Sequence, residues 1–272
     1  MGTTSNPLAS PVSWDLVAGD YDREARVVFD RYARSALDLA SPPIGARVLD
    51  VCCGSGALTL AAAPTAARVD AIDFSPEMLA RLDKHLRDDG IANVHVHNGD
   101  GQALPFVDTH FDAAFSMFGL MFFPDRAAGY RELHRVLVPG GRATVSSWQS
   151  FEHVPIFVRV FAAIAEADPT PAPPPRPLPL ATAEEHVAEM SAAGFVDVRV
   201  SAVTHTQEAP SVSAYWESMQ RTNVMLVLAQ RRIGGDAWRP ISEHVQRSLV
   251  EHFGPGPLSL PFPAWIAVGT KP

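Results

Sequence analysis

Lysine is almost absent from this sequence of 272 residues. Lys84 and Lys271 are the only lysines among 22 basic residues, and the others are arginines. A lysine is the reacting or phosphate-binding group in Schiff-base enzymes, in P-loop proteins and in reductases with a Tyr-x-x-x-Lys site. The sequence therefore offers few candidates for any of these function classes.

Cysteine, long apolar runs and clustered positive charge are scarce as well. The two cysteines, Cys52 and Cys53, are adjacent and poorly placed for an ordinary disulfide, which favours a reducing compartment. No stretch approaches the roughly 20 apolar residues of a membrane span, and the first residues lack the basic and apolar regions of a signal peptide. The formal net charge of -8, without a basic run, argues against nucleic acid as the main partner. We expect a cytoplasmic protein with neither a nucleic-acid nor a membrane partner.

What the sequence does contain is enough apolar residues for a full core, at 47% of the chain. Short apolar segments alternate with helical patterns along residues 45 to 149, and each of these segments has the length of a strand. They are residues 48–51, 68–73, 94–97, 111–117 and 142–148. Strands that alternate with helices in this way are typical of a parallel sheet with helices on both faces.

The flanking regions are mainly helical. Residues 11–40 show helical periodicity, which Ser41-Pro42-Pro43 ends. After residue 150 the pattern predicts helices, a proline-rich strap and two more strands. The helices are 151–167, 183–193, 211–232 and 236–252, the strap is 169–179, and the strands are 195–203 and 260–269. We divide the chain into a helical segment (1–44), a binding core (45–149) and a region of cap helices with the last two strands (150–272), within one structural domain.

Three features at the ends of the first three strands carry the chemistry. The run Asp50-Val51-Cys52-Cys53-Gly54-Ser55-Gly56 is a strand, a glycine turn and the start of a helix, where the backbone can approach a ligand closely. Asp73 ends the next strand, where a carboxylate can accept both hydroxyls of a ribose. Asn98-Gly99-Asp100-Gly101-Gln102 closes the third. A dinucleotide site would need G-x-G-x-x-G, but Thr59 stands at the third glycine position.

With these features in register, the sequence resembles the class I methyltransferases that use S-adenosylmethionine, particularly the ubiquinone/menaquinone-methylase-like group. The stretches that match are VLDVCCGSGALTL, VDAIDFSPEML, NGDGQALPF, FDAAFSMFGLMFFPD and ELHRVLVPGGRATVSSW. The resemblance covers most of residues 45–148. It implies a Rossmann-like, three-layer α/β/α fold with seven strands, the last antiparallel, and a helical cap.

The resemblance also implies a role for each matching position. Asp50, Gly54, Ser55, Gly56 and Ser116 are expected around the methionine part of the cofactor, and Asp73 at its ribose. The remaining expected cofactor residues are Phe74 and Met78 beside the adenine, Asp100, Gly101 and Gln102 at the adenine edge, Tyr21 folded over the cofactor, and Cys52 in the turn where the family usually has Gly or Ala.

The acceptor site is expected outside the shared motifs. Candidate acceptor-binding residues are Phe118, Met121, Trp148, Trp216 and Asn223. Packing of the core is the alternative for Phe118, Met121, Trp216 and Asn223. His153 is the candidate general base because it follows the fifth strand by a few residues, and an exposed loop histidine is the alternative. No metal ligand is assigned. An apolar pocket wall with few charges favours a hydrophobic or aromatic small-molecule acceptor.

These observations predict O- or N-methylation of a small metabolite, in natural-product biosynthesis. Three alternatives stay open at this point: C-methylation of a quinone-like ring, a rearrangement or cyclisation without methyl transfer, and a binding protein without enzymatic activity. The oligomeric state also stays open.

Overall fold

We analysed a computed structural model, which describes residues 6–168 and 178–272. Seven strands form one sheet in the order β3-β2-β1-β4-β5-β7-β6. Strands β1 to β5 are parallel, and β7 pairs antiparallel with both β5 and β6. The strands are β1 (Arg47–Val51), β2 (Arg68–Asp73), β3 (Val94–Asn98), β4 (Phe111–Met117), β5 (Leu137–Trp148), β6 (Val196–Ala209) and β7 (Leu258–Thr270). The predicted seven-stranded, mostly parallel sheet is confirmed.

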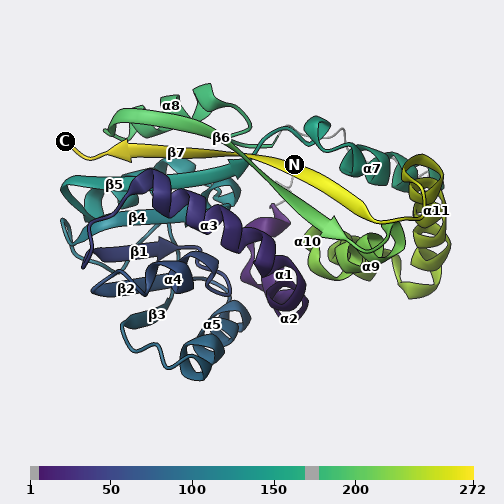
Figure 1. The fold of residues 1–272 in the computed structure, drawn as a ribbon, viewed down its shortest axis with the longest axis horizontal. Coiled ribbons are helices and arrows are strands. Elements are labelled where there is room, and N and C mark those ends of the chain that lie inside the picture. The colour runs from purple at the N-terminus through teal and green to yellow at the C-terminus, as the bar shows by residue number, and fades with distance from the viewer. Residues whose placement is uncertain (1–5, 169–177) are drawn as a thin grey trace, which may run out of the picture.

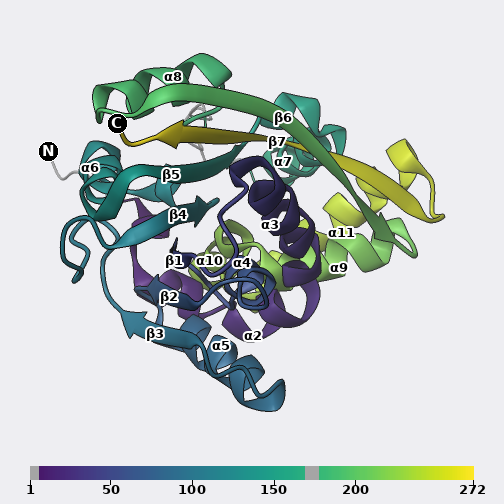
Figure 2. The ribbon, with the colours of Figure 1, turned by 60° about the vertical axis from the view of Figure 1, so that its left-hand side comes forward.

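Helices cover both faces of this sheet (Figures 1 and 2). Because side chains alternate along a strand, Val48 of β1 and Val69 of β2 belong to a core cluster beneath α3 and α4, whereas Leu49 belongs to the cluster beneath α6 and α8. The helices around the sheet are α3 (Arg26–Ala40), α4 (Ala57–Ala62), α5 (Pro76–Asp88), α6 (Arg126–Val136) and α8 (Ala183–Ala192). As predicted, Ser75 caps α5 and accepts a hydrogen bond from the amide of Met78.

The N-terminal region is broken where the sequence predicts helical periodicity throughout 11–40. Ahead of α3 lie a 3-10 turn η1 (Pro7–Ala9), two short helices α1 (Pro11–Asp15) and α2 (Ala18–Asp20), and a π-helix η2 (Tyr21–Ala25). The first break follows Asp15, whose side chain accepts hydrogen bonds from the Ser75 hydroxyl and the Glu77 amide at the start of α5. A tertiary contact therefore competes with continuation of the helix. We call residues 7–25 the N-terminal lid.

The C-terminal region forms a second helical group with its own apolar cluster. It contains α7 (Pro155–Ala167), α9 (Val212–Thr222), α10 (Val224–Ile233) and α11 (Gly235–Phe253), and β6 and β7 run from the sheet into it (Figure 1). The predicted single helix 211–232 is wrong, because Asn223 interrupts it and caps α10 by accepting from the Leu226 amide. Both late strands are longer than predicted. The predicted strap 169–179 lies largely outside the described residues.

The ends of β1, β2, β3 and β4 meet at one edge of the sheet, and the lid lies over this edge. The lid contacts α5 on one side and α9 and α10 on the other, so it joins the sheet to the C-terminal helices (Figure 1). Within the described residues, no helix combines the length and the apolar character needed to cross a membrane.

Candidate cofactor and acceptor site

The turn between β1 and α4 has a left-handed backbone at Cys52 (φ 61°), Gly54 (φ 54°) and Gly56 (φ 96°). At Gly56 a side chain is excluded twice, by its φ and because a Cβ would lie 2.5 Å from a methyl carbon of Leu82. The turn also meets the end of β4, where a Cβ on Gly119 would lie 2.3 Å from that of Cys52. These contacts fix a tight bend at the sheet edge.

Asp73, at the end of β2, is buried and holds this bend in place. One carboxylate oxygen accepts from the Gly54 amide and the other from the Ser75 amide, both at 2.9 Å. Burial raises the pKa of the Asp73 carboxyl to about 6, and the two backbone hydrogen bonds oppose this rise. The two backbone amides therefore hold the carboxylate rigidly at the bend, which suits an acceptor of ligand hydroxyls.

Asp50, in β1, is more deeply buried, at 1% exposure. Its Oδ2 accepts from the Thr59 hydroxyl at 2.6 Å, whereas its Oδ1 has no hydrogen-bond partner among the described residues. Burial raises the pKa of Asp50 to about 7, with the Thr59 hydrogen bond opposing the rise. A buried oxygen without a partner is unusual, and it indicates a place for a donor or cation from a ligand.

The predicted adenine edge is more open. Asp100 is exposed and accepts from the Gln102 amide (2.8 Å) and from Gln102 Nε2 (3.1 Å). A Cβ on Gly101 would lie 2.5 Å from the ring of Phe123, so the backbone is tightly packed there. Phe74 is half-buried and Met78 is buried, both next to the start of α5. These residues surround the ends of β2 and β3, and their role at the adenine stays a prediction.

A small cavity of about 40 Å³ lies between the β1–α4 turn and the N-terminal helices. Its lining includes Asp50, Gly54 and Ser55, and also Tyr21 from the lid. Binding sites for whole small molecules are usually about 300 Å³ or larger. A nucleoside ligand therefore requires the lid side chains to move away from the turn.

The cavity is also lined by Arg26 and Phe29 from α3 and by Met117 from β4, which the sequence did not single out. α-Helical spacing gives no signal for Arg26, because only the π-helix η2 places it beside Tyr21. The π-helix makes Tyr21 and Arg26 neighbours, since the Arg26 amide donates to the Tyr21 carbonyl, and the rings of Tyr21 and Phe29 stack at 5.3 Å. Tyr21, Arg26 and Phe29 therefore lie on one helical face.

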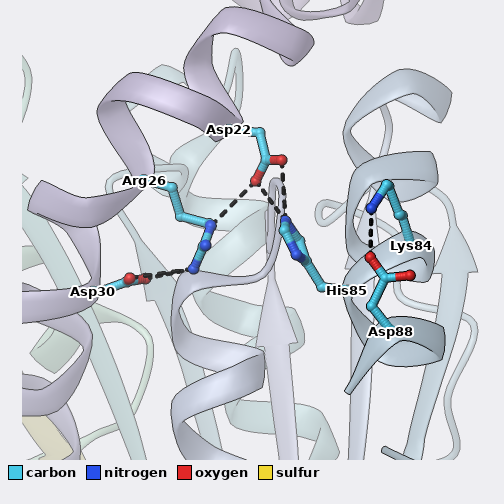
Figure 3. A network of polar contacts seen from close by, with 6 residues as sticks. All are labelled: Asp22, Arg26, Asp30, Lys84, His85 and Asp88. Atoms are coloured by element: carbon cyan, nitrogen blue, oxygen red, sulfur yellow. Dashed lines mark hydrogen bonds and ion pairs between the residues drawn. The ribbon is translucent and has the colours of Figure 1, made fainter. Parts of the chain in front are cut away.

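Arg26 is held by carboxylates one turn before and one turn after it (Figure 3). Its Nε donates to Asp22 at 3.1 Å and its Nη1 to Asp30 at 3.2 Å. Asp22 also lies 2.8 Å from Nε2 of His85, a residue of α5. The network joins the lid, α3 and α5 beside the cavity.

Aromatic rings continue from the cavity toward the C-terminal helices. Phe118 stacks on Trp148 at 4.1 Å, and Phe29 contacts both rings, at 5.3 and 5.8 Å. Tyr32 closes the cluster from α3, and its hydroxyl donates to the Phe262 carbonyl. We call Tyr21, Phe29, Tyr32, Phe118 and Trp148 the aromatic cluster. It brings two of the sequence-predicted acceptor residues next to the cavity.

The other predicted acceptor and catalytic residues lie elsewhere. Met121 is buried in the core beneath α6, and Trp216 is fully buried among the C-terminal helices, with its indole N–H donating to Ser242. Asn223 uses its side-chain oxygen as the cap of α10. His153 is exposed in the 3-10 turn η4 (Phe151–His153). Each of these four therefore has a packing, capping or surface position in this conformation.

The two cysteine side chains at the bend, Cys52 and Cys53, are not available as nucleophiles. Burial, strengthened by the charge of Asp73, raises the pKa of both Cys52 and Cys53 well above the ordinary thiol value, so neither is a thiolate at neutral pH. Ser116 accepts from the Leu120 amide at 3.1 Å and closes β4 beside the bend. Within the described part of the chain, no three His, Cys, Asp or Glu side chains are placed to hold a metal ion.

Comparison with known proteins identifies the class. The methyltransferase domain family matches residues 48–141. A demethylmenaquinone methyltransferase of Lactiplantibacillus plantarum is 32% identical over 174 residues, which are 55% of this chain and 72% of that protein. The chain therefore belongs to the class I S-adenosylmethionine-dependent methyltransferases.

Other matches extend the likeness without adding an activity. An uncharacterized protein of Mycobacterium tuberculosis is 40% identical over 135 residues, which are 50% of this chain and 48% of that protein. The chain thus spans about half the length of the first curated relatives that it matches. The crystal structure of the YcgJ protein from Bacillus subtilis has the same fold, with a TM-score of 0.60 at 21% identity over 88% of this chain and 97% of that one.

The residues present fit the cofactor of this family. S-adenosylmethionine combines a ribose, an adenine and an amino-acid end that bears an ammonium and a carboxylate. A rigid buried carboxylate (Asp73), a buried carboxylate oxygen without a partner (Asp50) and a buried hydroxyl without a partner (Ser55) all face the bend. The donor set therefore matches the polar groups of the cofactor.

Proposed function

We propose that the protein transfers a methyl group from S-adenosylmethionine to a small hydrophobic or aromatic acceptor. The observation that carries this proposal is the convergence of Asp50 and Asp73 on a tight bend, with unpartnered buried oxygens facing the cavity. When bound, the cofactor supplies a methyl group on a positively charged sulfur, which an acceptor atom attacks in line. The chain's own residues then need only to bind, orient and exclude water.

The proposed division of roles follows the sheet edge. Asp73 accepts the ribose hydroxyls, and Asp50 accepts the donor at the amino-acid end. Phe74, Met78 and the Asp100–Gln102 segment surround the adenine. Tyr21 covers the site from the lid, and the closed lid keeps water out, which strengthens each polar contact inside.

The aromatic cluster supports an acceptor with a flat or apolar surface. Phe29, Phe118 and Trp148 lie between the cavity and the C-terminal helices, and the apolar side chains of Met117 and Val203 pack with them. Rings that pack edge-to-face or offset favour aromatic ligands, and their faces also favour a nearby positive charge. The atom that accepts the methyl group is proposed to be oxygen or nitrogen.

A proton must leave the acceptor when a hydroxyl or ammonium is methylated. His153 is the proposed base from the sequence, and its exposed position requires η4 to move toward the site for this role. Replacement of His153 with Gln is expected to lower kcat for a phenolic acceptor without changing cofactor affinity. An unchanged kcat across pH would remove His153 from the mechanism.

The experiment that tests the function is incubation with S-adenosylmethionine and a set of phenols, aromatic amines and hydroquinones. Methyl transfer predicts release of S-adenosylhomocysteine and a product heavier by one CH2. A product of unchanged mass would support the rearrangement or cyclisation instead. No turnover of any acceptor, combined with no cofactor binding, would contradict the enzymatic proposal altogether.

C-methylation of a quinone-like ring is the second candidate, and the curated relatives named demethylmenaquinone methyltransferase favour it. A reduced quinone ring would suit the same aromatic cluster. The two candidates differ in the bond formed, so NMR of the product distinguishes a ring carbon–methyl bond from an O- or N-methyl group.

A further inference from the structure

The roles proposed above leave one charged group of the cavity without a function. Arg26 is the only cation among the described residues that line the cavity, and it shares that lining with Asp50 and Ser55. We propose that Arg26 binds the α-carboxylate at the amino-acid end of the cofactor, and that Asp22, anchored by His85, positions its guanidinium. This inference rests on the proposed function because it concerns the same cofactor.

The cavity already contains groups that complement both charges of an α-amino acid. Asp50 is 1% exposed and Ser55 2% exposed, and the Asp50 Oδ1 and Ser55 Oγ atoms have no hydrogen-bond partner among the described residues. An ammonium group suits the Asp50 oxygen. A carboxylate needs N–H or O–H donors, which the Ser55 hydroxyl and the remaining N–H groups of the Arg26 guanidinium offer.

Arg26 has donors left for this role. A guanidinium carries five N–H groups, and the hydrogen bonds of Arg26 within the described residues use Nε and Nη1 only. Its side chain is 23% exposed, so a carboxylate bound there would be largely shielded from water. The Nη2 edge is therefore the group that can pair with a ligand.

The surrounding network fixes the direction of the guanidinium (Figure 3). Asp22 and Asp30, at positions i−4 and i+4 on the same helical face, hold it from both sides. Asp22 is itself held by both its oxygens, at 2.8 and 3.0 Å from His85 Nε2. Because His85 belongs to α5, the guanidinium is positioned by an element outside its own helix, and His85 acts as a positioning residue.

The arrangement also explains why an arginine rather than a lysine is expected at this position. Two fixed carboxylates occupy separate nitrogens of one planar group, and a third nitrogen stays available for the ligand. A lysine has a single nitrogen on a flexible stem and could not hold Asp22, Asp30 and a ligand in one plane.

The test compares two ligands that share the nucleoside but differ at the amino-acid end. S-adenosylhomocysteine carries the carboxylate and ammonium, whereas 5′-methylthioadenosine carries neither. In titration calorimetry, Arg26→Gln is expected to lower the affinity for S-adenosylhomocysteine about 10- to 100-fold, which is the range expected for loss of a charged hydrogen bond. Its affinity for 5′-methylthioadenosine should stay within about twofold, since Asp73 and the adenine contacts are unchanged. Arg26→Lys should recover part of the loss.

The matched control is Arg239→Gln, which removes an exposed arginine of α11 that pairs with Asp236. It should change neither affinity. If Arg26→Gln leaves the affinity for S-adenosylhomocysteine unchanged, or weakens both ligands equally, the proposed role of Arg26 is wrong. If the wild-type protein binds neither ligand, the proposed function itself fails, which is a different outcome.

The role of His85 has its own test. His85→Gln keeps an N–H that can donate to Asp22, whereas His85→Leu removes it. We expect His85→Leu to lower the ratio of S-adenosylhomocysteine to 5′-methylthioadenosine affinity by several-fold, and His85→Gln to restore most of that ratio. A purely structural role would lower both affinities together, and equal ratios in the two variants would overturn the positioning role.

Discussion

At the scale of single residues, the site consists of carboxyl groups held in unfavourable surroundings. Burial raises the pKa of Asp50 to about 7 and that of Asp73 to about 6, although each accepts hydrogen bonds. A ligand that brings an ammonium, a sulfonium and ribose hydroxyls stabilises the ionised form of both groups. The proposed site is therefore energetically less favourable in the chain alone than in the chain with the cofactor bound.

Cofactor affinity should for this reason depend on pH. Between about pH 5 and 8, affinity for S-adenosylhomocysteine is expected to increase with pH, because protonated Asp50 and Asp73 must lose protons on binding. Calorimetry in two buffers of different ionisation enthalpy measures the protons released. Asp50→Asn should flatten the upper part of the profile, and a wild-type affinity independent of pH would contradict this account.

The raised pKa values of Asp50 and Asp73 also predict how the free energy of unfolding changes with pH. Because the pKa values of Asp50 and Asp73 are higher in the folded than in the unfolded chain, the folded chain binds more protons from about pH 4 to 7. The contribution of these groups to the free energy of unfolding therefore decreases as pH rises through that range. Denaturant unfolding of Asp73→Asn should show a weaker decrease than the wild type over the same range, and an identical pH dependence would rule out the raised pKa.

Asp73 itself gives the most local test of the ribose assignment. Asp73→Asn is expected to lower the affinity for S-adenosylhomocysteine by about tenfold or more, as expected for loss of a hydrogen bond to a charged group. Asp112→Asn is a control at the opposite end of the strands, where Asp112 accepts from the Arg47 amide. It should leave affinity unchanged. Equal affinities of Asp73→Asn and wild type would remove the ribose role.

At the scale of elements, the N-terminal lid is held by three carboxylates that each contact a different partner. Asp15 accepts from the start of α5, Asp22 contacts His85 farther along α5, and Glu24 accepts two hydrogen bonds from Arg221 of α9. Burial tends to raise the pKa of Glu24, but the hydrogen bonds from Arg221 and Ser218 outweigh this and lower it. The lid is therefore attached both to α5 and to the C-terminal helices.

Breaking the Glu24–Arg221 contact should loosen the lid with little effect on overall stability, because the pair is partly exposed. Glu24→Arg is expected to increase the dissociation rate of S-adenosylhomocysteine and amide exchange in residues 7–25. The double variant Glu24→Arg with Arg221→Glu should restore both. Unchanged exchange in the single variant would show that this contact does not hold the lid.

Elements with a strong local signal could be predicted from sequence, and elements decided by distant contacts could not. The strand at 68–73 and the cap at Ser75 were predicted because an apolar run and a capping residue are local. The helix breaks after Asp15 and at Asn223 were not predicted. The break after Asp15 depends on a contact with the start of α5, which is distant in the sequence. The break at Asn223 depends on a capping hydrogen bond inside a pattern that is otherwise helical. Arg26 was missed because it reaches the cavity beside Tyr21 through a π-helix that periodicity does not show.

At the scale of the whole molecule, one edge of the sheet carries the proposed cofactor site, and β6 and β7 extend from the sheet into a separate helical group. The sheet could be predicted from the sequence because the alternation of strands with helices and the glycine turn are patterns typical of this class of protein. The sequence did not determine the placement of Trp216 and Asn223, whose helical spacing fits an acceptor pocket and a packed helical core equally well. The aromatic cluster between the two parts is the region where acceptor specificity is expected.

If the aromatic cluster binds the acceptor and the sheet edge binds the cofactor, a substitution in the cluster should weaken acceptor binding without weakening cofactor binding. Trp148→Ala should raise KM for an aromatic acceptor by several-fold and leave S-adenosylhomocysteine affinity unchanged, because Trp148 packs against the rings of Phe29, Tyr32 and Phe118. Val158→Ala, at an exposed position of α7, is the control. A loss of cofactor affinity in Trp148→Ala would place this ring in the cofactor site instead.

The central claim is that the bend after β1 and the buried carboxylates beside it bind a nucleoside with a charged sulfur. Titration calorimetry of the wild-type chain with S-adenosylmethionine tests this claim most directly. We predict saturable binding at one site per chain, which is strongly weakened in Asp73→Asn. An absence of heat at millimolar cofactor, from a folded wild-type protein, would contradict it.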